Sequence, residues 1–240
     1  MDNILIAGPD KALITKIEAE LESKFKMSDG SNLTFILGVR VSAHQDGMRA
    51  MDQSHYDAQL LSKYGMQGAK PVATPLEKGA MESLVETGTD ATPIETGRYA
   101  EAIGSLLWLA SMTRPDMAFA AAFLARFSAF PNARHWGTVK RAFRYLRGTT
   151  GIRITFTGPY GTSGASLTVY RAVGLAADVK ISKRSKHINI KYHHLRRCAA
   201  DGIIRIEHVS STSNLADVCT KPIERIKFAG LRDKLGMRVV

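Results

Sequence analysis

The sequence has few of the features that mark secreted or membrane proteins. Its longest uninterrupted apolar run, Met117 to Ala125, is far shorter than the roughly 20 residues that a membrane-spanning helix needs. Asp2 and the absence of a basic stretch at the N-terminus argue against a secretory signal. The two cysteines, Cys198 and Cys219, do not have the spacing of metal ligands and indicate no disulfide framework. We therefore expect reduced thiols, as in an intracellular protein.

Acidic residues are nearly absent from one long stretch of the chain. Between Met117 and Ala200 the only acidic residue is Asp178, against fifteen lysines and arginines, so this stretch carries +14. Because the whole chain carries +11, the remainder sums to −3. A strongly basic part beside a nearly neutral one is typical of proteins that bind polyanions such as nucleic acids. A solvated basic face without a partner, or one that binds acidic lipid, is the alternative.

The patterning of apolar residues predicts an α+β fold. With 240 residues, of which 45% are hydrophobic, the chain can form one large or two small globular domains. Asp10 and Ser54 are the expected caps of the first two helices, and residues 77–97 are expected to form a loop. The predicted helices span 10–26, 54–65, 98–113, 116–130, 133–149, 188–200, 214–220 and 223–235, and the predicted strands lie within 33–53 and at 152–156, 166–170 and 204–209.

Seven stretches of sequence carry a family resemblance. In chain order they are NILIAGPDKALITKIEAEL, FILGVRV, YDAQLLSKYGM with KPVATPL, IGSLLWLASMTRPDMAFA, HWGTVKRAFRYLRGT, KHINIKYHHLR and NLADVCTKP. Together, and in this order, they resemble the Pol polyprotein of copia-type long-terminal-repeat retrotransposons. The resemblance covers nearly the whole chain.

The resemblance implies a division of the α+β fold into three parts. Residues 1–66 correspond to the end of a reverse transcriptase palm, in which the hairpin around FILGVRV resembles the primer grip. Residues 67–150 correspond to a helical thumb-like and connecting region, and residues 151–240 to a truncated RNase H-like region. The intact family enzyme is an RNA-directed DNA polymerase and a hybrid-specific ribonuclease, and it uses Mg²⁺ for both reactions.

The resemblance places Asp2 on the first aspartate of the family's polymerase motif and Asn3 on the second. Two Mg²⁺ ions require hard anionic ligands, and the family takes a further aspartate from an upstream palm segment. We therefore expect Asp2 to be a remnant that cannot support polymerisation alone, as in the tail of a larger protein. A solvated chain start is the alternative for Asp2 and Asn3.

Asp217 matches the fourth of four carboxylates that hold two metal ions in the family's RNase H. The segments that carry the first two carboxylates do not follow Phe156, and the third falls at Gly174, with Asp178 nearby. The resemblance thus predicts neither a bound metal nor RNase H activity for the chain as it stands. The alternative for Asp217 is a surface acid without a catalytic role.

Residues that bind nucleic acid are expected to be retained. Gly104 and Trp108 are four residues apart in one helix and so share a face, and a similar pair in related thumbs enters the minor groove of the template–primer. Packing of Trp108 in the core is the alternative. The basic candidates for phosphate contacts are Lys140, Arg141, Arg144, Arg147, Lys183, Arg184 and Lys186.

Three hypotheses about function follow. The chain is a catalytically inactive fragment that binds RNA–DNA hybrids or duplexes without sequence preference. Alternatively, another chain supplies the upstream palm and the two form a split polymerase. In the third hypothesis it is a pseudogene translation without function. All three imply an intracellular chain, cytoplasmic or nuclear, without a membrane partner.

Overall fold

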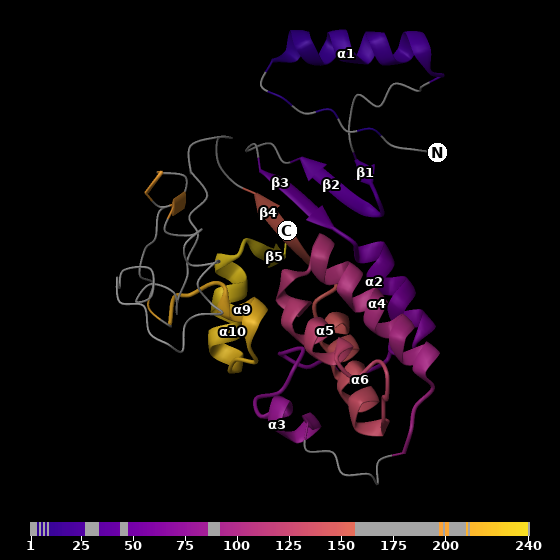
Figure 1. Ribbon diagram of the computed structural model, residues 1–240, viewed down its shortest axis with the longest axis vertical. Helices are drawn as coiled ribbons and strands as arrows, with labels where there is room; N and C mark the ends of the chain where they lie inside the picture. Colours follow the sequence, from indigo (N-terminus) through magenta and orange to yellow (C-terminus); the bar gives the residue numbers. More distant parts are fainter. Residues whose placement is uncertain are drawn as a thin grey trace.

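A computed structural model describes most of the chain. It covers residues 10–26, 34–43, 48–85, 92–156, 197–198, 200–201, 210 and 212–239, together with residues 4, 6 and 8. These residues form a mixed arrangement of helices and one antiparallel sheet, which confirms the predicted α+β class (Figure 1).

The elements follow the predicted order closely. They are α1 (Lys11–Lys24), β1 (Phe35–Ile36), β2 (Val39–Ala43), β3 (Arg49–Asp52), α2 (Ser54–Lys63), α3 (Ala80–Val85), α4 (Thr96–Met112), the 3-10 turn η1 (Pro115–Met117), α5 (Ala118–Ala125), α6 (Ala133–Arg147), β4 (Ile152–Phe156), α9 (Asp217–Thr220), α10 (Arg225–Lys234) and β5 (Met237–Val239). Helix α3 lies in the region that the sequence predicted to be a loop, and β5 was not predicted. The strands expected at 166–170 and 204–209 lie outside the described residues.

Among the described residues the sheet has five strands in sequence order, and every neighbouring pair is antiparallel. Strand β4 pairs with β3 in a register that sets Ala50 opposite Thr155, and β5 pairs with β4 so that Ile154 faces Met237. Strands β4 and β5 therefore extend the sheet begun by the hairpin, although they lie beyond the domain boundary expected near residue 150. The three-part division of the chain remains a prediction.

The main core lies among α2, α4, α5 and α6, with α9 and α10 packed beside them (Figure 1). Apolar side chains at helical spacing on α4 and α6 supply much of it; Tyr99, Leu106, Leu109, Phe143 and Leu146 are fully buried. The C-terminal segment joins this core through Phe228, whose ring packs edge-on against Tyr145 at 5.7 Å between centroids. The described C-terminal residues thus belong to the same packed body as the helices.

The first two helices begin in different ways: α1 has a side-chain N-cap, whereas the N-cap residue of α2 makes no such hydrogen bond. Asp10 caps α1 as predicted, because its Oδ1 accepts hydrogen bonds from the amides of Ala12 and Leu13. The prediction that Ser54 caps α2 was wrong: Ser54 is the first helical residue, and its amide donates to Asp52 Oδ1 at 3.1 Å. Asp52, two residues before Ser54, thus supplies the side-chain oxygen that accepts a hydrogen bond from the first amide of α2.

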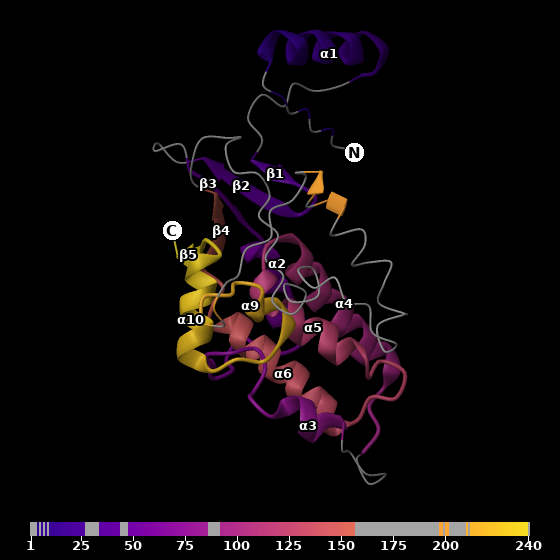
Figure 2. The ribbon, with the colours of Figure 1, turned by 60° about the vertical axis from the view of Figure 1, so that its left-hand side comes forward.

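Helix α1 stands apart from the rest of the molecule. Figures 1 and 2 both show it beyond the sheet, on the side away from the helical core. None of its residues is buried, and the apolar face formed by Ile14, Ile17 and Leu21 is only partly covered. Within the described part of the chain, no helix has the length and apolar character needed to cross a membrane.

Candidate nucleic-acid interface

Helix α4 presents Gly104 and Trp108 on its exposed face. Tyr99, Ala102, Ile103, Leu106, Leu109 and Ala110 are the buried residues of α4, so the apolar side of the helix is satisfied without the tryptophan. The Trp108 side chain is 40% exposed, and the alternative that it is enclosed in the core is therefore wrong. A Cβ at position 104 would meet no atom of a neighbouring element within 4 Å, so the surface beside Trp108 is open.

Helix α6 carries four of the predicted phosphate contacts, and three of them already have partners within the protein. Arg144 Nε donates to the carbonyl of Lys70 at 2.8 Å, and Arg147 Nε donates to that of Gln67 at 2.7 Å. Arg141 forms an ion pair with Glu77. These arginines fasten the extended segment 67–77 to α6, which is a structural role that the sequence did not reveal.

Lys140 differs from its three neighbours on α6. It is exposed, and no hydrogen bond or ion pair joins it to any residue that the structure describes. Its ammonium group is thus available to a ligand. The Nη1 and Nη2 groups of Arg144 and Arg147 can still donate to a ligand, because only the Nε atoms contact the carbonyl oxygens.

The β1–β2 hairpin, which resembles the primer grip, turns through a strained residue. Ile36 pairs with Val39, so the loop consists of Leu37 and Gly38 alone, and both have positive φ, 49° and 77°. A two-residue loop of this kind favours Asn-Gly, since positive φ is costly for a leucine. Leu37 is nevertheless 63% exposed. A strained, exposed apolar residue at a hairpin tip is a candidate contact residue.

An ion pair between the half-exposed Arg40 and the buried Asp52 supports the base of the hairpin. Arg40 on β2 donates from Nε and Nη2 to the two carboxylate oxygens of Asp52, at 3.1 and 2.9 Å. Burial alone would raise the pKa of Asp52, but hydrogen bonds from Arg40 and Ser54 outweigh it and hold the pKa below the usual range. An open hollow of about 450 Å³ lies beside this pair, lined by Phe35, Gly38, Arg40, Asp52, Gln53, Ser54 and His55.

Asp217, the predicted RNase H remnant, is buried and neutralised. It is 5% exposed, so the alternative that it is a surface acid was wrong. Its Oδ2 lies 2.8 Å from Lys227 Nζ and 3.0 Å from Lys221 Nζ. Burial raises its pKa, but the two lysines more than compensate and leave the pKa below the usual range. A carboxylate oxygen shared by two ammonium groups does not fit a Mg²⁺ ion, which needs uncompensated anionic oxygen.

A second buried network joins the helices and was not predicted. Arg114, which is fully buried, donates from Nε and Nη2 to Asp116 at 3.1 and 2.9 Å, and Nη2 also donates to Thr149 Oγ1 at 2.6 Å. The Tyr145 hydroxyl donates to Asp116 and accepts from Arg232 Nη1. The signal in the sequence is an arginine and an aspartate inside its most apolar region.

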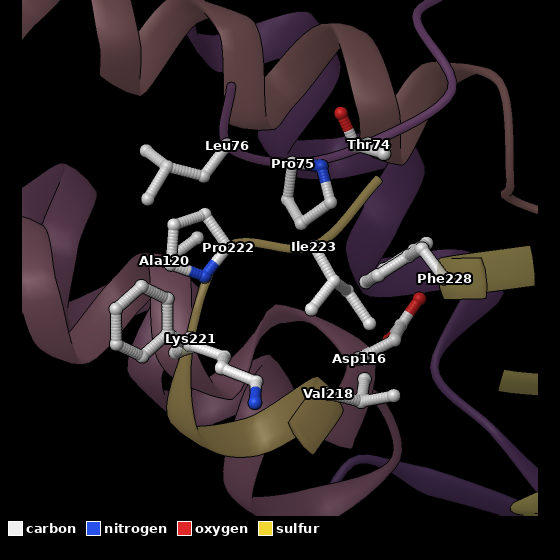
Figure 3. Close-up of a pocket in the computed structure, with 11 residues that line it drawn as sticks. Thr74, Pro75, Leu76, Asp116, Ala120, Val218, Lys221, Pro222, Ile223 and Phe228 are labelled. Carbon is white, nitrogen blue, oxygen red and sulfur yellow. The ribbon is translucent and has the colours of Figure 1, made fainter. Parts of the chain in front are cut away.

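Two of the family-like stretches meet at a seam between α5 and the C-terminal segment (Figure 3). Pro222 and Ile223 lie against Pro75 and Leu76 there. The remaining cavity measures about 10 Å³, which is room for one water molecule at most. The seam is thus a packing contact that holds distant parts of the sequence together, and it offers no space for a ligand.

The other predicted site residues lie outside the described residues; they are Asp2, Lys183, Arg184 and Lys186. The same holds for Asn3, Gly174 and Asp178. In the part of the chain that the structure describes, no group of three or more His, Cys, Asp or Glu side chains is arranged to hold a metal ion.

Comparison with known proteins relates the chain to retrotransposon polyproteins. Residues 1–78 match a family described as reverse transcriptase (RNA-dependent DNA polymerase). The chain is 26% identical to the retrovirus-related Pol polyprotein from transposon TNT 1-94 of Nicotiana tabacum, over 99% of this chain and 24% of that protein. It is 27% identical to the corresponding polyprotein from transposon RE1 of Arabidopsis thaliana, over 99% of this chain and 21% of the relative. No solved structure matches the chain.

The alignments also describe what this chain does not contain. It spans about a quarter to a fifth of the length of the curated relatives it matches. The alignment with the tobacco protein is 320 residues long, whereas this chain has 240, so at least 80 aligned positions have no counterpart here. Part of the relative's sequence is therefore missing inside the matched region.

Proposed function

Because this chain is related to the Pol polyproteins of copia-type retrotransposons, we propose that it binds RNA–DNA hybrids and duplexes without sequence preference and catalyses neither polymerisation nor RNA cleavage by itself. One observation carries the proposal: α4 exposes Trp108 beside the open Gly104 position on a single face. An exposed aromatic ring beside a residue without a side chain can approach the sugars of a shallow groove closely.

The charge distribution agrees with this proposal. The stretch from Met117 to Ala200 carries +14, and Lys140 within it has no partner among the described residues. Phosphate contacts of this kind act without sequence preference and weaken as salt rises. The strained hairpin tip at Leu37 and the hollow beside Arg40 add a second surface that a primer strand could contact.

Catalytic inactivity is proposed from the chemistry of the remaining acids. The resemblance sets the amide of Asn3 where the family has its second aspartate, and an amide is a poorer Mg²⁺ ligand than a carboxylate. At the proposed RNase H position, Asp217 is held by Lys221 and Lys227. No reaction step is therefore assigned to a metal ion in this chain.

The finer assignment of the fold belongs to the same proposal. We assign residues 1–66 to the end of a palm with a hairpin like the primer grip, residues 67–150 to a thumb-like and connecting region, and residues 151–240 to a truncated RNase H-like region. The sequence positions missing relative to the tobacco polyprotein support a truncation.

The proposal is tested with purified protein on a labelled RNA–DNA hybrid and on a primed RNA template. We expect binding that falls with salt: if about 4 to 6 phosphates are neutralised, log K against log salt has a slope of roughly −3.5 to −5.5. We expect no primer extension and no hydrolysis with Mg²⁺ or Mn²⁺. Primer extension that Asp2→Ala abolishes, or hydrolysis that Asp217→Asn abolishes, would contradict inactivity; a flat salt dependence would contradict binding.

A second candidate function rests on α1. Its face of Ile14, Ile17 and Leu21 is only partly covered, and no residue of α1 is buried; an amphipathic helix gains stability by burying such a face. This favours a chain that completes a polymerase when an upstream palm segment covers α1. Co-expression with the upstream reverse transcriptase segment of a relative, followed by primer extension, distinguishes this candidate from an inactive binding protein.

A further inference from the structure

Arg98 at the start of α4 rests on an aromatic ring of α6. Its guanidinium carbon lies 4.9 Å from the centroid of the Trp136 ring, which is within the range of a cation–π contact. No carboxylate among the described residues forms an ion pair with Arg98, and the residue is exposed. The ring thus restricts the side chain while its N–H groups stay free to donate.

The neighbouring carboxylate on α4 is already occupied. Glu101 lies one turn after Arg98, but it accepts Lys63 Nζ at 2.6 Å. The Tyr64 ring contacts the Trp136 ring edge-on, with 6.1 Å between the ring centroids. Tyr64 itself stacks on the buried Phe143 ring, at 4.7 Å between centroids. Arg98 is therefore positioned by rings that pack onto the core, and Glu101 does not neutralise its charge.

Arg98 lies at the edge of the α4 face that carries Trp108, because ten helical residues separate the two side chains by about 80° around the axis. Residues 98, 101, 105 and 108 follow the spacing of one helical stripe. Ten residues separate Arg98 from Trp108, a rise of about 15 Å along the helix. Lys140 lies one turn beyond Trp136 on α6, so it flanks the Arg98–Trp136 pair.

We propose that Arg98, positioned by Trp136 and flanked by Lys140, contacts the phosphates of a bound duplex about 15 Å from Trp108. This proposal rests on the proposed function, because it extends the same interface along α4. Phosphates in one strand succeed each other every 3.4 Å of helix axis, so the extension corresponds to about four base pairs. Arginine suits this role because its planar guanidinium stacks on a ring while its edge donates to phosphate.

The test compares Arg98→Gln with wild-type protein in fluorescence anisotropy on RNA–DNA hybrids of 8 and 20 base pairs, over 50 to 200 mM salt. One phosphate contact accounts for a salt slope of about 0.9, or about a 3.5-fold change in affinity across this range. We expect Arg98→Gln to reduce the slope by that amount on the 20-base-pair hybrid, with a smaller effect on the short one. Arg225→Gln, an exposed arginine on α10, is the matched control and should leave the slope unchanged.

The role of Trp136 is tested by a double-mutant cycle. Trp136→Leu should weaken binding in the Arg98 background but not in the Arg98→Gln background, and Trp136→Phe, which keeps a ring, should retain part of the affinity. Circular dichroism melting checks that each variant is folded. Wild-type binding that Arg98→Gln leaves unchanged overturns this inference alone. Absence of wild-type binding overturns both this inference and the proposed function.

Discussion

The Oδ2 atom of Asp217 lies 2.8 Å from Nζ of Lys227 and 3.0 Å from Nζ of Lys221, in a site where the carboxylate is buried and the lysines are partly exposed. This arrangement makes Asp217 a stabilising residue of the C-terminal segment. We expect Asp217→Asn to lower the free energy of unfolding by about 1–3 kcal/mol, since the two ammonium groups lose an anionic partner. Urea denaturation measures the change.

The matched control for Asp217 is Asp233, which pairs with Arg238 but whose side chain is 65% exposed. Asp233→Asn should change the stability by less than about 0.5 kcal/mol, as exposed ion pairs usually do. Equal effects of the two substitutions would contradict the buried role assigned to Asp217.

The basic residues of α6 should separate into two kinds. Arg144→Gln and Arg147→Gln should each lower stability by about 1 kcal/mol, because each removes a hydrogen bond to a main-chain carbonyl of segment 67–77. Lys140→Gln should leave stability unchanged and weaken hybrid binding, because Lys140 has no partner among the described residues. Thermal melting and anisotropy on the same preparations check both outcomes. A loss of stability in Lys140→Gln would show that it, too, is structural.

Helix α4 shows what the spacing of apolar residues can predict and where it fails. The helical spacing of Ile103, Leu106 and Ala110 indicates which side of α4 is buried, and hence that Trp108 can face outward. Leu107, four residues after Ile103, is nevertheless 39% exposed. Spacing within a helix predicts which way each side chain points. It does not predict contacts with segments that have no regular secondary structure.

The partners of Arg144 and Arg147 belong to that second category, since segment 67–77 has no helical or strand period. The burial of Asp217 depends on Lys227 from another helix, which the sequence could not place. Strand β5 is only three residues long and is stabilised by its pairing with β4, so the local sequence pattern does not predict it.

The hairpin tip offers a prediction in which stability and binding move in opposite directions. Leu37→Asn should raise the free energy of unfolding by about 0.5–1 kcal/mol, because asparagine tolerates the positive φ of this turn better than leucine does. The same substitution should weaken hybrid binding if the exposed leucine contacts the primer strand. Denaturation and anisotropy measure the two effects, and a variant that gains stability with unchanged affinity would exclude the hairpin tip from the interface.

Asp57 should make stability depend on pH near neutrality. Burial raises the pKa of Asp57 to about 7, which the distant Arg114, 3.9 Å away, only partly offsets; its Oδ1 has no hydrogen-bond partner in the structure. The folded state therefore holds a proton that the unfolded state releases above about pH 4. Stability from this group is present at low pH and is lost as pH rises from about 4 to about 7.

The measurement for Asp57 is urea denaturation of wild type and Asp57→Asn between pH 5 and 8. The wild type should lose stability relative to the variant as pH rises, by at most about 1.4 kcal/mol per pH unit. The comparison cancels His135, whose pKa burial lowers and which acts in the opposite direction in both proteins. Parallel curves for the two proteins would show that Asp57 is ionised throughout this range.

The central claim is that the exposed face of α4 binds nucleic acid, and Trp108→Ala tests it most directly. Because Trp108 is 40% exposed and the buried side of α4 is complete without it, the melting temperature should move little, in contrast to the loss of about 3–5 kcal/mol expected for a core tryptophan. Affinity for a 20-base-pair RNA–DNA hybrid should fall about tenfold, within the 1–3 kcal/mol typical of aromatic contacts to nucleic acid. Gly104→Leu should weaken binding as well by blocking close approach, whereas Ile226→Ala, at an exposed apolar residue of α10, should not. Unchanged affinity in both Trp108→Ala and Gly104→Leu, with wild-type melting, would contradict the account.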